Sequence, residues 1–74
     1  MELPMVSGRE VIKALGKAGF RVDRQRGSQV RLEKKTVNGM IKLIVPLHHN
    51  LKKGTLRGII KESGLTMQEF NRLL

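Results

Sequence analysis

The 74-residue sequence contains no cysteine, which excludes disulfide bonds and thiolate chemistry. It has no Trp or Tyr and only two Phe, which argues against a site that stacks nucleic-acid bases on aromatic side chains. No apolar run approaches the roughly 18 residues that a membrane-spanning helix needs. The first residues lack the basic and apolar segments of a signal peptide, so we expect a cytoplasmic chain without membrane contact.

The sequence gives little support for a metal or cofactor site. Without cysteine, zinc ligands would have to come from His48, His49 and carboxylates. The sequence also contains no signature of a nucleotide or flavin cofactor. We therefore expect no metal and no cofactor.

Positive charge is the strongest global feature of the sequence. Fifteen Lys and Arg against six Asp and Glu give a formal net charge of +9. Between Arg21 and Lys61 there are eleven basic and two acidic residues, whereas the rest of the chain has four of each sign. Such segregation favours a surface for a polyanion, although a basic protein without such a partner could share the composition.

Helix signals open the chain. Ser7 and Glu10 have the spacing of a capping box, and Val6 and Val11 have that of a hydrophobic staple. Gly19 is a suitable terminator. The sequence therefore predicts a helix that begins after Ser7 and ends before Gly19.

Three strands should follow this helix. Residues 20–23 and 29–33 alternate between apolar and polar side chains, and residues 40–45 are nearly all apolar, as in a buried central strand that Pro46 ends. A turn is expected at residues 26–28, and Asn38-Gly39 is a strong hairpin signal.

A two-residue turn at Asn38-Gly39 would fix the register of the hairpin. Val37 would face Met40, and the ladder would continue unless Pro46 breaks it. Two further pairs follow from this register: Leu32 with Val45, and Gln29 with His48.

Two helices should close the chain. Gly54-Thr55 leads into an apolar helical face that ends at Gly64, and Thr66 with Glu69 forms a second capping box. The order α-β-β-β-α-α predicts an α+β fold, with a three-stranded antiparallel sheet and helices packed on one of its faces. Residues 1–74 should form a single domain.

The segment before the second helix has features of a phosphate site. Residues 47–55 lead into a helix start, where backbone N–H groups attract phosphate, and Lys52, Lys53 and Arg57 add positive charge. An ordinary connection between a strand and a helix would look similar.

Cleavage of RNA without a metal needs proton carriers and groups that stabilise negative charge on phosphorus. Histidine suits the first role, and Arg or Lys suits the second. His48 and His49 are adjacent and should point to opposite sides of an extended segment. The register above favours His48 as the one on the basic side, and a surface or capping histidine is the alternative.

Four motifs in order resemble the HicA (YcfA-like) family: LGKAGF at residues 15–20, RGS at 26–28, VPLH at 45–48 and KGTLRGII at 53–60. The resemblance runs from about Pro4 to Phe70, and the ordered set is more specific than any single motif. It implies a fold like a double-stranded-RNA-binding domain. It also implies an endoribonuclease toxin that cleaves mRNA and is neutralised by a HicB-type antitoxin.

One residue departs from the family pattern. The family has Gly-Ser-His, with that histidine as its catalytic residue, whereas this chain has Gly27-Ser28-Gln29. A glutamine amide has no proton that titrates near neutral pH, so it cannot serve as a general acid or base. Three explanations are open: an engineered replacement of histidine, a natural member that binds without cleaving, or chemistry carried by His48.

The leading hypothesis is a HicA-type toxin with position 29 as the proton-transfer site and His48 as an assisting residue. The rivals are a non-catalytic RNA-binding module and a domain that docks an acidic antitoxin. DNA binding through a helix-turn-helix is disfavoured, because Arg72 is the only basic residue of the last helix. The expected RNA-binding residues are Arg24, Arg26, Ser28, Arg31, Lys52, Lys53 and Arg57.

Overall fold

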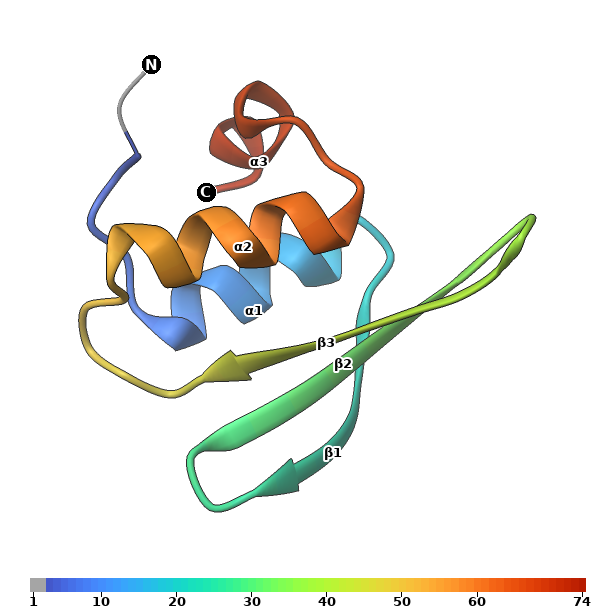
Figure 1. The fold of residues 1–74 in the computed structure, drawn as a ribbon, viewed down its shortest axis with the longest axis horizontal. Helices are drawn as coiled ribbons and strands as arrows, with labels where there is room; N and C mark the ends of the chain where they lie inside the picture. Colours follow the sequence, from blue (N-terminus) through green and yellow to red (C-terminus); the bar gives the residue numbers. More distant parts are fainter. Residues whose placement is uncertain (1–2) are drawn as a thin grey trace.

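The computed structural model describes residues 3–74, which form three α-helices and one three-stranded antiparallel sheet in the order β1-β2-β3. The helices lie on one side of the sheet (Figure 1). The predicted α+β fold and the predicted element order are confirmed, and both are consistent with a double-stranded-RNA-binding-domain-like architecture. The elements are α1 (Gly8–Lys17), β1 (Arg21–Arg26), β2 (Gln29–Thr36), β3 (Gly39–Pro46), α2 (Lys53–Ser63) and α3 (Met67–Leu73).

Both ends of α1 follow the sequence signals. The Ser7 hydroxyl accepts a hydrogen bond from the Glu10 N–H (3.1 Å), and the Glu10 carboxylate accepts one from the Ser7 N–H (3.0 Å). Gly19 has a φ of +101°, and the Phe20 N–H donates to the Leu15 carbonyl at 3.0 Å, which closes a Schellman turn. Local capping chemistry therefore sets the length of this helix.

The C-terminal helices have different kinds of start. Thr66 and Glu69 form the predicted capping box, and the hydrogen bonds from the Thr66 backbone and side chain hold the pKa of Glu69 below its ordinary value. α2 begins one residue before Gly54-Thr55, with Lys52 as an N-cap that makes no side-chain capping hydrogen bond. Gly64, at a φ of +81°, ends α2 as predicted.

The core lies between the sheet and the helices. Its largest fully buried side chains come from α1, β2, β3, α2 and α3, so each of these elements is fixed by burial of its apolar face. These side chains are Phe70, Leu15, Leu32, Leu56, Val11 and Val45.

The predicted register of the β2–β3 hairpin is wrong by two residues. Thr36 pairs with Gly39, so the turn consists of Val37 and Asn38. A turn centred on Asn38-Gly39 needs a positive φ at both residues, and among residues 3–74 only glycines have one. The two-residue shift leaves every side chain on its predicted face.

The same shift changes the cross-strand partners. Leu32 faces Leu43 and no longer Val45, although it still shares a face with Val45. Gln29 faces Pro46, and the ladder ends there, so the predicted Gln29–His48 pair does not form.

Gly8 joins α1 to the segment after β3. Its N–H donates to the His48 carbonyl at 2.9 Å. A Cβ atom on Gly8 would overlap the Pro46 carbonyl oxygen and lie 3.0 Å from the Leu47 Cα. Because Gly8 is buried against backbone that cannot move aside cheaply, the position has no room for a side chain.

Replacement of Gly8 by Ala should lower the free energy of unfolding by about 1–3 kcal/mol, because the added methyl group overpacks this contact. Gly16→Ala is the matched control in the same helix. Apart from its chain neighbours and the backbone of its own helix, no atom lies within 4 Å of the new Cβ, so this change should raise stability by about 0.5–1 kcal/mol. Urea unfolding followed by circular dichroism measures both effects, and equal effects would contradict the close approach at Gly8.

Candidate nucleic-acid interface

The side of the sheet away from the helices carries most of the charged strand residues. In β2, Val30 and Leu32 are buried toward the helices, so Gln29 and Arg31 point the other way. We call this side the open face. The pairing places on it Arg21, Arg24 and Arg26 from β1, Gln29, Arg31, Glu33 and Lys35 from β2, and Met40, Lys42, Ile44 and Pro46 from β3.

A β-bulge in β1 determines which arginines reach the open face. Val22 pairs with Leu32, but Arg24 pairs with Arg31, so Asp23 is an extra residue. Without the bulge, strict alternation would turn Arg24 and Arg26 toward the helices. The bulge therefore moves two guanidinium groups to the same face as Gln29.

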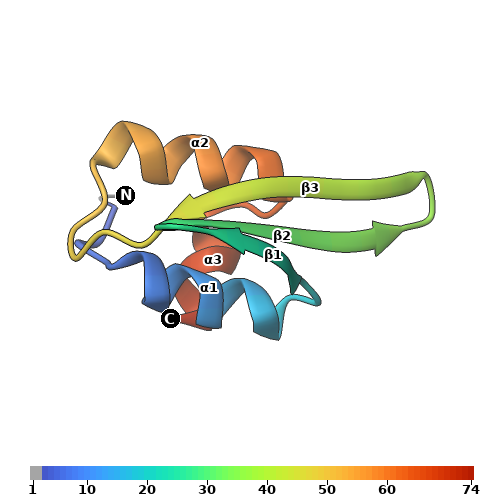
Figure 2. The same cartoon turned by 90° about the horizontal axis from the view of Figure 1, so that it is seen from below.

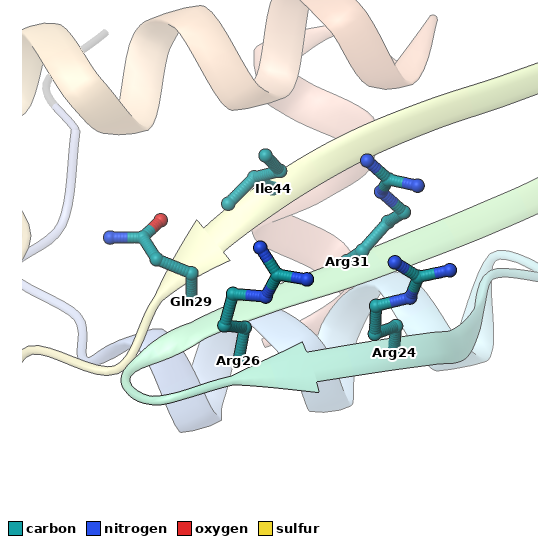
Figure 3. A pocket seen from close by; sticks show the side chains of 5 residues that line it. All are labelled: Arg24, Arg26, Gln29, Arg31 and Ile44. Atoms are coloured by element: carbon teal, nitrogen blue, oxygen red, sulfur yellow. The ribbon is translucent and has the colours of Figure 1, made fainter.

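Three arginines, Gln29 and Ile44 surround a cavity of about 270 Å³ on the open face (Figure 3). We call it the arginine cavity. Arg26 is the cross-strand partner of Gln29, and Arg31 is that of both Arg24 and Ile44, so all three strands contribute to its wall. Ile44 remains 49% exposed, which leaves an apolar surface beside the charged groups.

The open face has one carboxylate, and it is already paired. Glu33 is 8% exposed, and its Oε2 accepts hydrogen bonds from Arg21 Nη2 at 2.8 Å and Nε at 3.2 Å. No other salt bridge occurs within residues 3–74. The guanidinium groups of the arginine cavity thus lack carboxylate partners in the described chain, and their positive charge is available to an anion.

Four of the predicted site residues meet in this cavity: Arg24, Arg26, Gln29 and Arg31. The others do not line it. Ser28 lies in the β1–β2 turn, and its carbonyl accepts a hydrogen bond from the Leu47 N–H at 2.7 Å. His48 is exposed in the segment after β3, two residues beyond the last ladder pair.

The remaining predicted residues, Lys52, Lys53 and Arg57, are exposed at the start of α2. The first turn of α2 contains no acidic residue, so nothing there neutralises the positive end of the helix dipole. Backbone contacts fix this region: the Leu51 N–H donates to the Val6 carbonyl at 2.9 Å, and the Leu51 side chain is buried.

Two features of the cavity escaped the sequence analysis. The bulge at Asp23 has no signature in the sequence, because β1 has no glycine or proline that would mark one. Residues 40–45 were predicted to form a buried central strand, but β3 is an edge strand of the sheet and β2 is the central one. The alternation of β3 turns Ile44 to the open face. Its neighbours Leu43 and Val45 point into the core. The alternation of side chains along a strand could therefore have predicted that Ile44 faces the other side.

The arrangement suits an anion that can also use apolar contact. Guanidinium groups bind phosphate through paired N–H donors, and an exposed isoleucine can pack on a sugar or a base. Within residues 3–74, no three His, Asp or Glu side chains gather as metal ligands. No helix in the same range is long and apolar enough to cross a membrane.

Residues 8–65 match the family model described as the HicA toxin of bacterial toxin–antitoxin systems. The match covers 58 of the 74 residues, from the start of α1 to the segment after α2, and includes every residue of the arginine cavity. The comparison with curated proteins gives no match.

Replacing Arg24, Arg26 and Arg31 together by Ala should weaken binding to a polyanion such as heparin. The slope of log affinity against log salt should become shallower by roughly two to three units, as expected when three contacts are lost. The control exchanges Arg9, Lys13 and Arg72 for Ala, which removes the same charge from the helical side. Similar slopes for the two variants would show that net charge, and not the arginine cavity, governs binding.

Proposed function

The chain belongs to the HicA toxin family of bacterial toxin–antitoxin systems, and from this premise we propose that it is a toxin that binds mRNA on the open face. The arginine cavity holds a phosphate of the RNA. Residues 1–74 act as one domain, in the cytoplasm, without a metal or cofactor. With Gln29 at this position, the chain binds RNA without cleaving it, and a histidine at position 29 would make it an endoribonuclease.

The observation that carries this proposal is the position of Gln29 in the cavity with Arg24, Arg26 and Arg31. A phosphate held by these guanidinium groups would lie beside the side chain of position 29. In RNA cleavage, cations stabilise the negative charge that develops on the phosphorane oxygens. The cavity supplies such cations from two neighbouring strands of a rigid sheet.

The missing element is a proton carrier. The 2′-hydroxyl must lose a proton as it attacks phosphorus, and the departing 5′ oxygen must gain one. The amide of Gln29 can donate or accept a hydrogen bond but cannot exchange protons near neutral pH. A histidine there would have a suitable pKa and would stand opposite Arg26, its cross-strand neighbour.

An antitoxin is the second partner that family membership implies. We propose a HicB-type protein that presents carboxylates to the open face. The unpaired arginines attract such a surface, and the half-exposed Ile44 gives it an apolar contact. RNA and antitoxin would then compete for the same face.

The test compares the chain that carries Gln29 with its Gln29→His variant on a long single-stranded RNA in the presence of EDTA. The variant should cleave RNA at least about a hundredfold faster than the chain with Gln29, because positioned acid–base groups contribute roughly 10²–10⁴ in rate. It should also slow growth when expressed in bacteria without an antitoxin. Gel analysis of timed samples gives the rates.

Gln25→His is the matched control. Gln25 is exposed on β1 but lies opposite Val30, on the side of the sheet that faces the helices. This variant should leave RNA intact. A folded Gln29→His protein that does not cleave RNA would remove position 29 as the proton-transfer site.

The role of His48 is tested in the Gln29→His background. His48→Ala should lower the cleavage rate without abolishing it if His48 assists. Cleavage by the chain with Gln29 that disappears with His48→Ala would instead place the chemistry at His48. RNA binding that weakens steeply with added salt, in the absence of cleavage, is expected for the chain with Gln29.

A further inference from the structure

The β2–β3 hairpin extends well beyond the third strand. β1 pairs with β2 only as far as Arg21 and Glu33, whereas β2 and β3 stay paired up to Thr36 and Gly39. Residues 34–41 therefore form a two-stranded extension, which we call the arm. The outer part of the arm projects past β1 and past the helices (Figures 1 and 2).

We propose that the arm is a second RNA contact, which holds the part of the strand that flanks the phosphate in the arginine cavity. The contact is made through phosphates by Lys35 of the arm and by Lys42, which lies next to the base of the arm, and through a base by Met40. This inference rests on the proposed function, because it assumes that RNA occupies the open face.

The first argument is the face on which these residues lie. Lys35 and Met40 are direct partners in the ladder, and both are exposed on the open face, as is Lys42. Lys35 is four residues from Arg31 along β2, which is about 13 Å in a strand. One phosphate cannot contact both residues over that distance, so the arm would contact nucleotides next to the one in the arginine cavity.

The second argument is that one hollow continues from the arginine cavity to Lys42 and another lies beside the arm. A hollow of about 470 Å³ shares Arg31 and Ile44 with the arginine cavity and adds Lys42. Another, of about 430 Å³, contains Lys35 and Met40. The two hollows share no lining residue, but Lys42 of the first is the cross-strand partner of Glu33 of the second.

The third argument is charge. From Lys34 to Lys61 the sequence contains no Asp or Glu. Glu33 is paired with Arg21, and the exposed Glu62 of α2 is the other carboxylate that borders these hollows. This charge favours a polyanion over a peptide, which would need acidic residues at matching positions.

The arm also offers apolar surface where aromatic side chains are absent. Phe20 and Phe70 are 5% and 0% exposed, so neither can stack on a base. Met40 is 47% exposed beside Lys35, and a flexible thioether packs well on flat, irregular partners. Lys34 differs from Lys35, because its ammonium lies 5.7 Å from the Phe20 ring centre and anchors the base of the arm.

The test measures binding of fluorescent single-stranded RNA by anisotropy, with two lengths at several salt concentrations. The short RNA has about three nucleotides, which cover roughly 10 Å at the duplex spacing of about 3.4 Å per nucleotide, and the long one about twelve, which cover roughly 40 Å at that spacing. The arm variant is Lys35→Gln with Lys42→Gln. The matched control is Arg9→Gln with Lys13→Gln, which removes the same charge from α1. The cavity variant is Arg24→Gln with Arg26→Gln.

The arm variant should lose about tenfold in affinity for the long RNA and less than about twofold for the short one, and its salt slope on the long RNA should fall by about 1.4, the value for two single-strand phosphates. The control should lose less than about twofold on both RNAs. The cavity variant should lose affinity for both.

Each other outcome decides between the two proposals. If the arm variant equals the control on the long RNA while the cavity variant is weakened, the arm proposal is wrong and the proposed function stands. Equal losses on both RNAs would make the arm lysines a source of general charge only. If the cavity variant also binds normally, the proposed function fails.

Lysines on exposed strands can also serve to prevent aggregation, so the arm variant could become insoluble. NMR on the unsubstituted chain avoids that difficulty. Backbone amide resonances of residues 34–41 should shift with the long RNA and stay fixed with the short one. Absence of shifts with the long RNA would overturn the proposal.

Discussion

The close approach of Gly8 to the end of β3 is the contact on which the arrangement of the molecule depends. It leaves no room for a side chain, and its hydrogen bond to the His48 carbonyl ties the start of α1 to the segment that leads into α2. The same segment is hydrogen-bonded through the Leu47 N–H to the β1–β2 turn and through the Leu51 N–H to Val6. One backbone junction thus positions the first helix, the turn before Gln29 and the basic start of α2.

The two faces of the sheet have different roles in the fold. Apolar side chains of β2 and β3 bury themselves under the helices, and this burial stabilises the fold. The other face is then free to carry like charges that a core could not accept. The bulge at Asp23 is the local irregularity that brings β1 into this scheme, since it sends Arg24 and Arg26 to the charged side.

Sequence reasoning succeeded where the signal was local. The capping boxes at Ser7 and Thr66 and the terminators Gly19 and Gly64 act through hydrogen bonds within a few residues, and each is present. The hairpin register failed because it depends on which residues of the turn take a positive φ, and Asn38 does not. The bulge in β1 was missed because it depends on how β1 pairs with β2, and the sequence of β1 alone does not show this pairing. The sequence analysis named Arg24, Arg26, Arg31 and Gln29 as separate site residues. Only the strand pairing shows that they line one cavity.

The crowding of guanidinium groups on the open face links ligand binding to the stability of the folded state. Arg24 and Arg31 are direct cross-strand neighbours, and like charges in that position repel each other. Dissolved ions screen this repulsion, so salt that loosens a bound polyanion also strengthens the empty fold. A bound anion relieves it more fully and stabilises the folded state by mass action. The chain is therefore most susceptible to proteolysis in dilute salt, when its ligand has left.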